Sequence, residues 1–128
     1  MIAFITHQLP WIAWMIAITV QSSFAGIGLP TGIAVSDKVL HFIVFGILGL
    51  LITRGMRYTK IQFFKNRPAI TAVVLGCIFA LSDEVHQAFV PARSAEILDW
   101  VADFLGIVVF SYLYSRWMHS REEAVSQS

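Results

Sequence analysis

The sequence predicts an all-α, polytopic membrane protein with four transmembrane helices and both termini in the cytoplasm. Three observations predict this fold class: an apolar composition, four long apolar stretches, and one strongly basic connection between them. The 128 residues are 57% hydrophobic and 13% charged, whereas soluble domains use charged residues at about 25%. The mean hydropathy is +0.71. This composition excludes a soluble cytosolic enzyme, and the net charge of +1 excludes a nucleic-acid partner.

The four apolar stretches predict helices at about residues 4–24, 36–54, 69–90 and 95–117 of a single membrane domain. A helix needs about 20 residues to cross a hydrocarbon core of about 30 Å. The third and fourth stretches are long enough by themselves, whereas the first two need flanking residues. The tail 118–128 is expected to be frayed and solvated.

The first stretch can also be interpreted as a cleaved signal peptide, because it ends in the small residues of Ser23-Phe24-Ala25. Signal peptides begin with a basic region, but no Lys or Arg precedes this stretch. Trp11 and Trp14 are typical of an aromatic anchor at the membrane interface. We therefore expect a helix that is retained in the mature protein.

The connections between the stretches set the expected orientation. The loop 54–67 carries five basic residues and no acidic one: Arg54, Arg57, Lys60, Lys65 and Arg67. The positive-inside rule places this loop in the cytoplasm, so the connections 25–35 and 91–94 face outward. Because the connection 91–94 is so short, the third and fourth helices are expected to be antiparallel neighbours.

Polar residues that a simple membrane anchor would not need lie at the outward ends of helices two, three and four. They are Asp37, Lys38, His41, Asp83, Glu84, His86, Gln87, Arg93, Glu96, Asp99 and Asp103. At 1.5 Å per residue, Asp83 and Asp103 both lie about 12 to 14 Å below the connection joining their helices, so they could be neighbours. Helical spacing aligns three sets of these residues, each on one face of its helix. The sets are Asp83, His86 and Gln87; Glu96, Asp99 and Asp103; and Asp37 with His41. These stripes predict one polar cavity that opens outward, and ionisable groups within a membrane usually mark function.

Some of these residues also have structural interpretations. Asp37 and Glu96 would lie in first helical turns, where negative charge is favourable to the helix dipole. Lys38 and Arg93 could extend to the interface as ordinary anchors. The deeper acids have no such explanation, and their structural alternative is a hydrogen-bonded network that fixes helix packing.

The residue types in the predicted cavity suit acid–base, metal and anion-binding chemistry. A carboxylate beside a histidine suits general acid–base catalysis, and the expected catalytic residues are Asp83, Glu84, His86 and Asp99. Carboxylates and imidazoles can also hold a divalent metal, for which the candidate ligands are His41, His86 and Asp99. A guanidinium fork suits a phosphate headgroup, and the expected substrate-binding residues are Arg93, Gln87, Lys38, His41 and Asp103.

These features together predict a site that binds or processes a cell-envelope lipid or a lipid-linked precursor. A noncatalytic membrane module that binds an antibiotic or a partner protein is one alternative. An ion or proton carrier is another, because chains of Asp, Glu and His also build relays. A relay would need polar groups in the inner half of the membrane as well, and the sequence places few there.

Three segments resemble the VanZ-like family of small bacterial membrane proteins, which is named for a teicoplanin-resistance determinant. They are 37–42 (DKVLHF), 82–91 (SDEVHQAFVP) and 99–106 (DWVADFLG), with Arg93 between the last two. The resemblance covers about residues 36 to 110 and implies a multi-pass protein of the bacterial inner membrane. It also implies an association with reduced susceptibility to teicoplanin-type antibiotics, for which the family has no established reaction.

Overall fold

The computed structural model describes residues 2–24, 34–91 and 95–127, and within these ranges it contains helices and no strand. The all-α prediction is therefore confirmed. The helices are α1 (Ile2–His7), α2 (Leu9–Ser22), α3 (Ala34–Arg57), α4 (Gln62–Asn66), α5 (Pro68–Gln87) and α6 (Ile97–Ser126).

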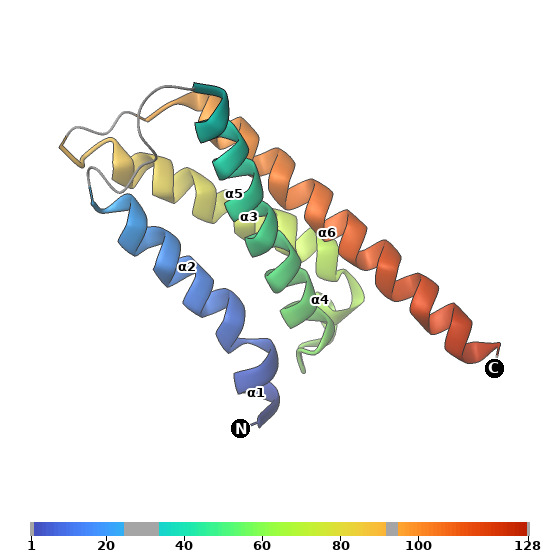
Figure 1. Cartoon of the computed structure of the whole chain (residues 1–128). Helices are drawn as coiled ribbons and strands as arrows, with labels where there is room; N and C mark the ends of the chain where they lie inside the picture. The colour runs from blue at the N-terminus through green and yellow to red at the C-terminus, as the bar shows by residue number, and fades with distance from the viewer. Residues whose placement is uncertain (1, 25–33, 92–94, 128) are drawn as a thin grey trace.

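Helix α3 is the central helix of the bundle. It packs against α6, α5 and α2, and α5 also packs against α6. Figure 1 shows that α5 and α6 run in opposite directions, as the short connection between them predicts. The C-terminal ends of α2 and α5 and the N-terminal ends of α3 and α6 lie at one end of the molecule, whereas both chain termini lie at the other (Figure 1). Which side of the membrane each end faces stays a prediction.

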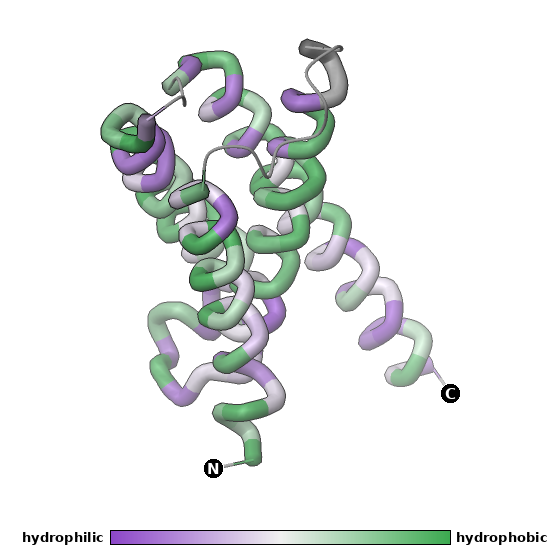
Figure 2. The backbone as a smooth tube through the Cα atoms, turned by 60° about the vertical axis from the view of Figure 1, so that its left-hand side comes forward, coloured by the Kyte–Doolittle hydropathy of each residue, from purple (hydrophilic) through white to green (hydrophobic). Residues whose placement is uncertain are grey.

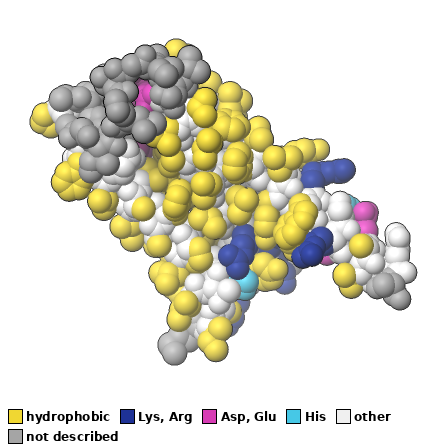
Figure 3. All heavy atoms as spheres, in the orientation of Figure 1, with side chains coloured by type: hydrophobic (Ala, Val, Ile, Leu, Met, Phe, Trp, Pro, Cys, Tyr) yellow, Lys and Arg dark blue, Asp and Glu magenta, His cyan; other side chains and the backbone are white. Residues whose placement is uncertain are grey.

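Three helical segments are long and apolar enough to cross a membrane: Asp37–Arg57, Pro68–Gln87 and Ile97–Ser126. Their outer faces are apolar, as Figure 3 shows for one side of the molecule. Along α5 this exposed face consists of Ile70, Val74, Ile78, Leu81 and Val85. Figure 2 shows hydrophilic residues mostly toward the two ends of the bundle. An apolar exterior around buried polar groups suits a lipid environment, and the chain is a multi-pass membrane protein.

The first predicted helix, 4–24, is divided at Gln8 into α1 and α2. Pro10 lies in the first turn of α2, where its missing N–H is tolerated, but its ring disfavours continuation of the preceding helix. The 14 residues of α2 span about 21 Å, and α1 and α2 together span about 31 Å. Only the combined length matches a hydrocarbon core of about 30 Å, so a fourth membrane crossing by this segment stays a prediction.

The C-terminal tail is exposed, but the prediction that it is frayed is wrong, because α6 continues to Ser126. Its side chains support the helix: Glu122 forms an ion pair with Arg57 of α3, and His119 lies 3.1 Å from Glu123 one turn later. Two further differences concern α4, a short helix in the basic loop that the sequence did not predict, and α5, which ends at Gln87 rather than near residue 90. Pro91 follows closely and disfavours helix before it.

Glycines allow α3 and α6 to approach closely. A Cβ atom on Gly106 of α6 would lie 2.1 Å from the backbone oxygen of Phe42 on α3, and one on Gly49 would lie 2.8 Å from the backbone oxygen of Ile107. Small residues at helix interfaces are typical of membrane bundles because they permit such backbone contact. This contact brings the polar end of α3 against that of α6.

We expect Gly106→Ala to destabilise the bundle by about 1 to 3 kcal/mol, because the added methyl group meets rigid backbone. The measurement is the thermal unfolding midpoint in detergent. Gly76→Ala is a matched control, since its Cβ would meet only the flexible side chain of Ile107, at 3.0 Å. Equal midpoints for the two variants would contradict this account of the α3–α6 contact.

Candidate functional site

Polar residues from three helices meet at the end of the bundle where α3 and α6 begin. We name this region the acidic end and define it by its six acids, Asp37, Asp83, Glu84, Glu96, Asp99 and Asp103. Four of them are buried, namely Asp83, Glu84, Asp99 and Asp103, and these are the buried acids of the described residues. Each helix contributes because its polar residues recur at a spacing of three or four.

His41 and Asp103 join α3 to α6. The Nδ1 atom of His41 lies 2.9 Å from Oδ1 of Asp103 and donates to it. Asp103 is only 1% exposed. Its second oxygen, Oδ2, is buried and has no hydrogen-bond partner among the described residues. The pair is therefore a firmly placed imidazole beside a carboxylate with one unsatisfied oxygen.

Lys38 forms a second connection between α3 and α6. Its ammonium group donates to Asp99 and to Oε2 of Glu96, the latter at 3.0 Å. Asp99 is buried, whereas Glu96 is exposed at the start of α6. The charge of this predicted substrate-binding residue is thus already shared between two carboxylates of the protein.

Asp83 joins α5 to α2. Its Oδ1 accepts a hydrogen bond of 2.6 Å from the hydroxyl of Ser22, and its Oδ2 accepts one of 2.9 Å from the amide of Gln87. All three side chains are buried. The sequence analysis missed Ser22, whose only signal was a pair of serines at the end of an apolar stretch. Asp83 and Asp103 lie in the same region, as predicted, but they bond to different helices.

Glu84 faces the start of α6. Its Oε2 accepts a hydrogen bond of 3.2 Å from the backbone N–H of Glu96, the residue that precedes the helix. The side chain of Glu84 is buried, with 7% exposure. It therefore lies between the first turn of α6 and the His41–Asp103 pair.

One predicted site residue of the described part of the chain, His86, does not join this cluster. His86 is exposed, and its Nε2 lies 3.0 Å from the hydroxyl of Ser23 on the chain after α2. Because the helix turns between Asp83 and His86, the imidazole of His86 lies outside the buried face of α5. The predicted metal set of His41, His86 and Asp99 is therefore not formed. Arg93 and the connection 25–33 lie outside the described residues.

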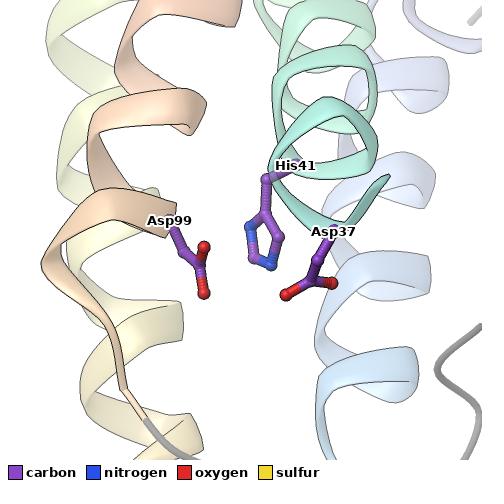
Figure 4. A group of neighbouring side chains, drawn as sticks. All are labelled: Asp37, His41 and Asp99. Atoms are coloured by element: carbon purple, nitrogen blue, oxygen red, sulfur yellow. The ribbon is translucent and has the colours of Figure 1, made fainter. Parts of the chain in front are cut away.

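Among the residues that the structure describes, two groups of three side chains could each hold a metal ion. In each group the candidate ligand atoms lie within 4.8 Å of one another. One group consists of Asp37, His41 and Asp99, and Figure 4 shows the imidazole between the two carboxylates. The other consists of His41, Glu84 and Asp103. Because His41 belongs to both, only one of them can use a given ring nitrogen at a time.

A small cavity of about 30 Å³ adjoins His41 and Asp83. It is lined by polar and apolar residues of α2, α3 and α5, including Ile18, Gln21, Asp37, Leu40, Phe45 and Gln87. This volume has room for an ion or about two water molecules. A lipid headgroup is larger and would have to bind at the mouth of the cluster.

The acidic end carries a large surplus of negative charge, because Lys38 is the one Lys or Arg of the described residues that faces its six acids. Other Lys and Arg side chains gather away from the acidic end, in the right-hand half of Figure 3. A region with this charge attracts cations and repels anions unless a cation lies between.

Comparisons with known proteins agree with the helical membrane architecture. Residues 2–118 match the model of the VanZ/LLP1 family. An uncharacterised protein of the fission yeast Schizosaccharomyces pombe, C11E3.10, is 29% identical over 96 residues, which cover 74% of this chain and 56% of the yeast protein. The chain thus spans about half the length of the curated relative it matches. No solved structure matches the chain.

Proposed function

The chain belongs to the VanZ/LLP1 family, and we propose that it binds a membrane lipid through the phosphate of its headgroup at the acidic end. The observation that carries this proposal is the cluster of buried acids, with His41 and Lys38, at one end of three apolar helices. Ionisable groups in a membrane are costly, and they usually face a ligand or a water-filled cavity. At the end of the bundle they lie within reach of lipid headgroups.

The charge distribution supports an outward-facing site in a bacterial inner membrane. The end opposite the acidic end carries the basic residues Arg54, Arg57, Lys60, Lys65, Arg67, Arg116 and Arg121. Basic residues favour the cytoplasmic side. The acidic end would then face the outer leaflet, where cell-envelope lipids and lipid-linked precursors are accessible. An effect on susceptibility to teicoplanin-type antibiotics would follow from binding such a lipid.

Phospholipids and polyprenyl-linked precursors both carry a phosphate group, so a site for a lipid phosphate could bind either class. The similar yeast protein supports a ligand that does not depend on a bacterial cell wall. The His41–Asp103 pair also supports processing of a bound lipid, because a carboxylate that fixes one ring nitrogen prepares the other to act as a general base.

A proton or ion relay is less well supported. Away from the acidic end, the buried polar side chains of the described residues are the hydroxyls of Thr53, Thr71 and Ser111. A relay needs titratable groups along its length, and hydroxyls alone do not supply them.

The test is native mass spectrometry of the detergent-purified protein with phosphatidylglycerol, a polyprenyl phosphate or diacylglycerol, which has no phosphate. We expect at least tenfold stronger retention of one of the first two lipids than of diacylglycerol. Asp99→Asn removes one negative charge from the acidic end and releases Lys38 from that carboxylate, so it is expected to increase this retention. Ser82→Ala is the matched control, because Ser82 is exposed and bonds only to Phe79 of its own helix.

Equal retention of all three lipids, or retention that Asp99→Asn leaves unchanged, would contradict the proposal. Retention of the polyprenyl phosphate alone would assign the site to lipid-linked precursors. Binding of a teicoplanin-type antibiotic without any lipid would favour a noncatalytic antibiotic-binding module instead.

A further inference from the structure

We infer that His41, Glu84 and Asp103 hold a divalent cation, and that this cation joins the acidic end to the lipid phosphate. The inference rests on the proposed function for the lipid, but the cation site has its own geometry. The three side chains come from α3, α5 and α6, so an ion at this point would connect all three long helices.

The spacing of the ligand atoms suits a single ion. One atom from each side chain lies within 4.8 Å of the other two. Ligands bonded to a zinc ion at about 2.0 to 2.2 Å can be no more than about 4.4 Å apart. Side-chain adjustments of a few tenths of an ångström are therefore enough to bring all three ligand atoms within bonding distance of one ion.

The unsatisfied oxygen of Asp103 is a second, independent observation that supports a bound cation. Oδ2 is buried and has no partner among the described residues, although the side chain is only 1% exposed. A buried polar atom without a partner costs about 1 to 3 kcal/mol, and more when it carries charge. A cation at this oxygen would satisfy it.

No Lys or Arg of the residues that the structure describes pairs with this set. Lys38 is engaged with Asp99 and Glu96. Glu84 accepts one backbone N–H from Glu96. Ligands bind a metal in their deprotonated forms, so Glu84 and Asp103 would bind the ion as carboxylates.

The alternative set of Asp37, His41 and Asp99 is less suitable. Asp37 is exposed to solvent. Asp99 already binds the ammonium group of Lys38, whose positive charge would repel a metal ion at the same carboxylate. Glu84 and Asp103 are both buried and have no such neighbour among the described residues.

One imidazole with two carboxylates is a ligand set for Zn²⁺ or Mn²⁺ rather than for Mg²⁺ or Ca²⁺, which prefer oxygen alone. Three protein ligands leave at least one position open. An oxygen of a lipid phosphate could occupy that position, and the neighbouring cavity of about 30 Å³ could hold water ligands. An acidic region would thereby bind an anionic headgroup.

The cation site is tested first without lipid, by equilibrium dialysis of the metal-stripped protein against Mn²⁺ or Zn²⁺. We expect one ion per chain. Glu84→Gln is expected to weaken binding by at least roughly 10- to 100-fold, and its amide oxygen can still accept the hydrogen bond from Glu96. Asp37→Asn is expected to weaken binding less than Glu84→Gln does, and the control Ser82→Ala, at an exposed position, is expected to change the affinity less than twofold. No bound ion, or loss in Asp37→Asn but not in Glu84→Gln, would overturn this site.

The bridging role is tested with lipid, by repeating the mass spectrometry with EDTA and then with added Mn²⁺ or Zn²⁺. We expect EDTA to remove the lipid and the metal to restore it in the wild type but not in Glu84→Gln. Lipid retention that EDTA leaves unchanged would overturn the bridge and leave the proposed function standing. One bound ion with no retained lipid would overturn the proposed function. An unchanged unfolding midpoint for metal-free Glu84→Gln would show that the variant still folds.

Discussion

Replacing both partners of the α3–α6 pair, as His41→Phe with Asp103→Leu, is expected to abolish lipid binding and leave the protein at least as stable as the wild type. Exchanging a buried ion pair for apolar residues of similar volume is often neutral, or stabilising by about 1 to 4 kcal/mol. A phenylalanine at position 41 would also lie near Phe45, whose ring centroid is 6.4 Å from that of His41. The measurements are the thermal unfolding midpoint and lipid retention.

Comparison of the single variants with the double variant distinguishes a role of the pair in lipid binding from a role in helix packing alone. Asp103→Leu alone leaves the imidazole of His41 without its partner, so its midpoint should fall below that of the double variant. If the pair were required for helix packing, the double variant would unfold below the wild type. A double variant that still retained lipid would show that the pair does not belong to the site.

Asp83→Ala is expected to cause the largest loss of stability among these variants. It removes the acceptor of two buried donors, the hydroxyl of Ser22 and the amide of Gln87. Each unsatisfied donor costs about 1 to 3 kcal/mol, which gives about 2 to 6 kcal/mol for the two donors. Ser22 is the last residue of α2, so the loss of its hydrogen bond to Asp83 should weaken the packing of α2 against α5. Thermal unfolding in detergent measures the effect.

Two neighbouring variants serve as controls for Asp83→Ala. Asp83→Asn keeps a carbonyl oxygen that can accept one of the two hydrogen bonds, so it should recover part of the loss. Ser82→Ala should be close to wild type, because that side chain is exposed. If Asp83→Ala unfolded at the wild-type midpoint but lost lipid binding, Asp83 would be a ligand-contacting residue rather than a helix connection.

The membrane architecture was predictable because it depends on composition along the chain. Twenty or more apolar residues can lie in few environments other than a bilayer, and α3, α5 and α6 confirm the three corresponding stretches. The break at Gln8 and the helical tail were harder to predict. The first depends on the conformation around Pro10, and the second depends in part on the ion pair between Arg57 and Glu122, which are distant in sequence.

The position of the candidate site was predictable, but its contacts were not. The positions of the polar residues along the chain place them near the same end of three helices, and the helices bring these ends together. Rotation about each helix axis depends on packing, and it directs Asp83 to Ser22, Asp103 to His41, and His86 to the exposed chain near Ser23. The approach of α3 to α6 at Gly106 is likewise a property of the pair. Periodicity in one helix cannot predict it.

The most direct test of the central claim, that the acidic end is a lipid-phosphate site, is the shift in unfolding midpoint when a phosphate lipid is added. A ligand that binds only the folded state raises the midpoint in proportion to its occupancy. We predict a rise for the wild type with phosphatidylglycerol or a polyprenyl phosphate, and none for the His41→Phe, Asp103→Leu double variant. An equal rise in both proteins, or no rise in the wild type with either lipid, would contradict the account.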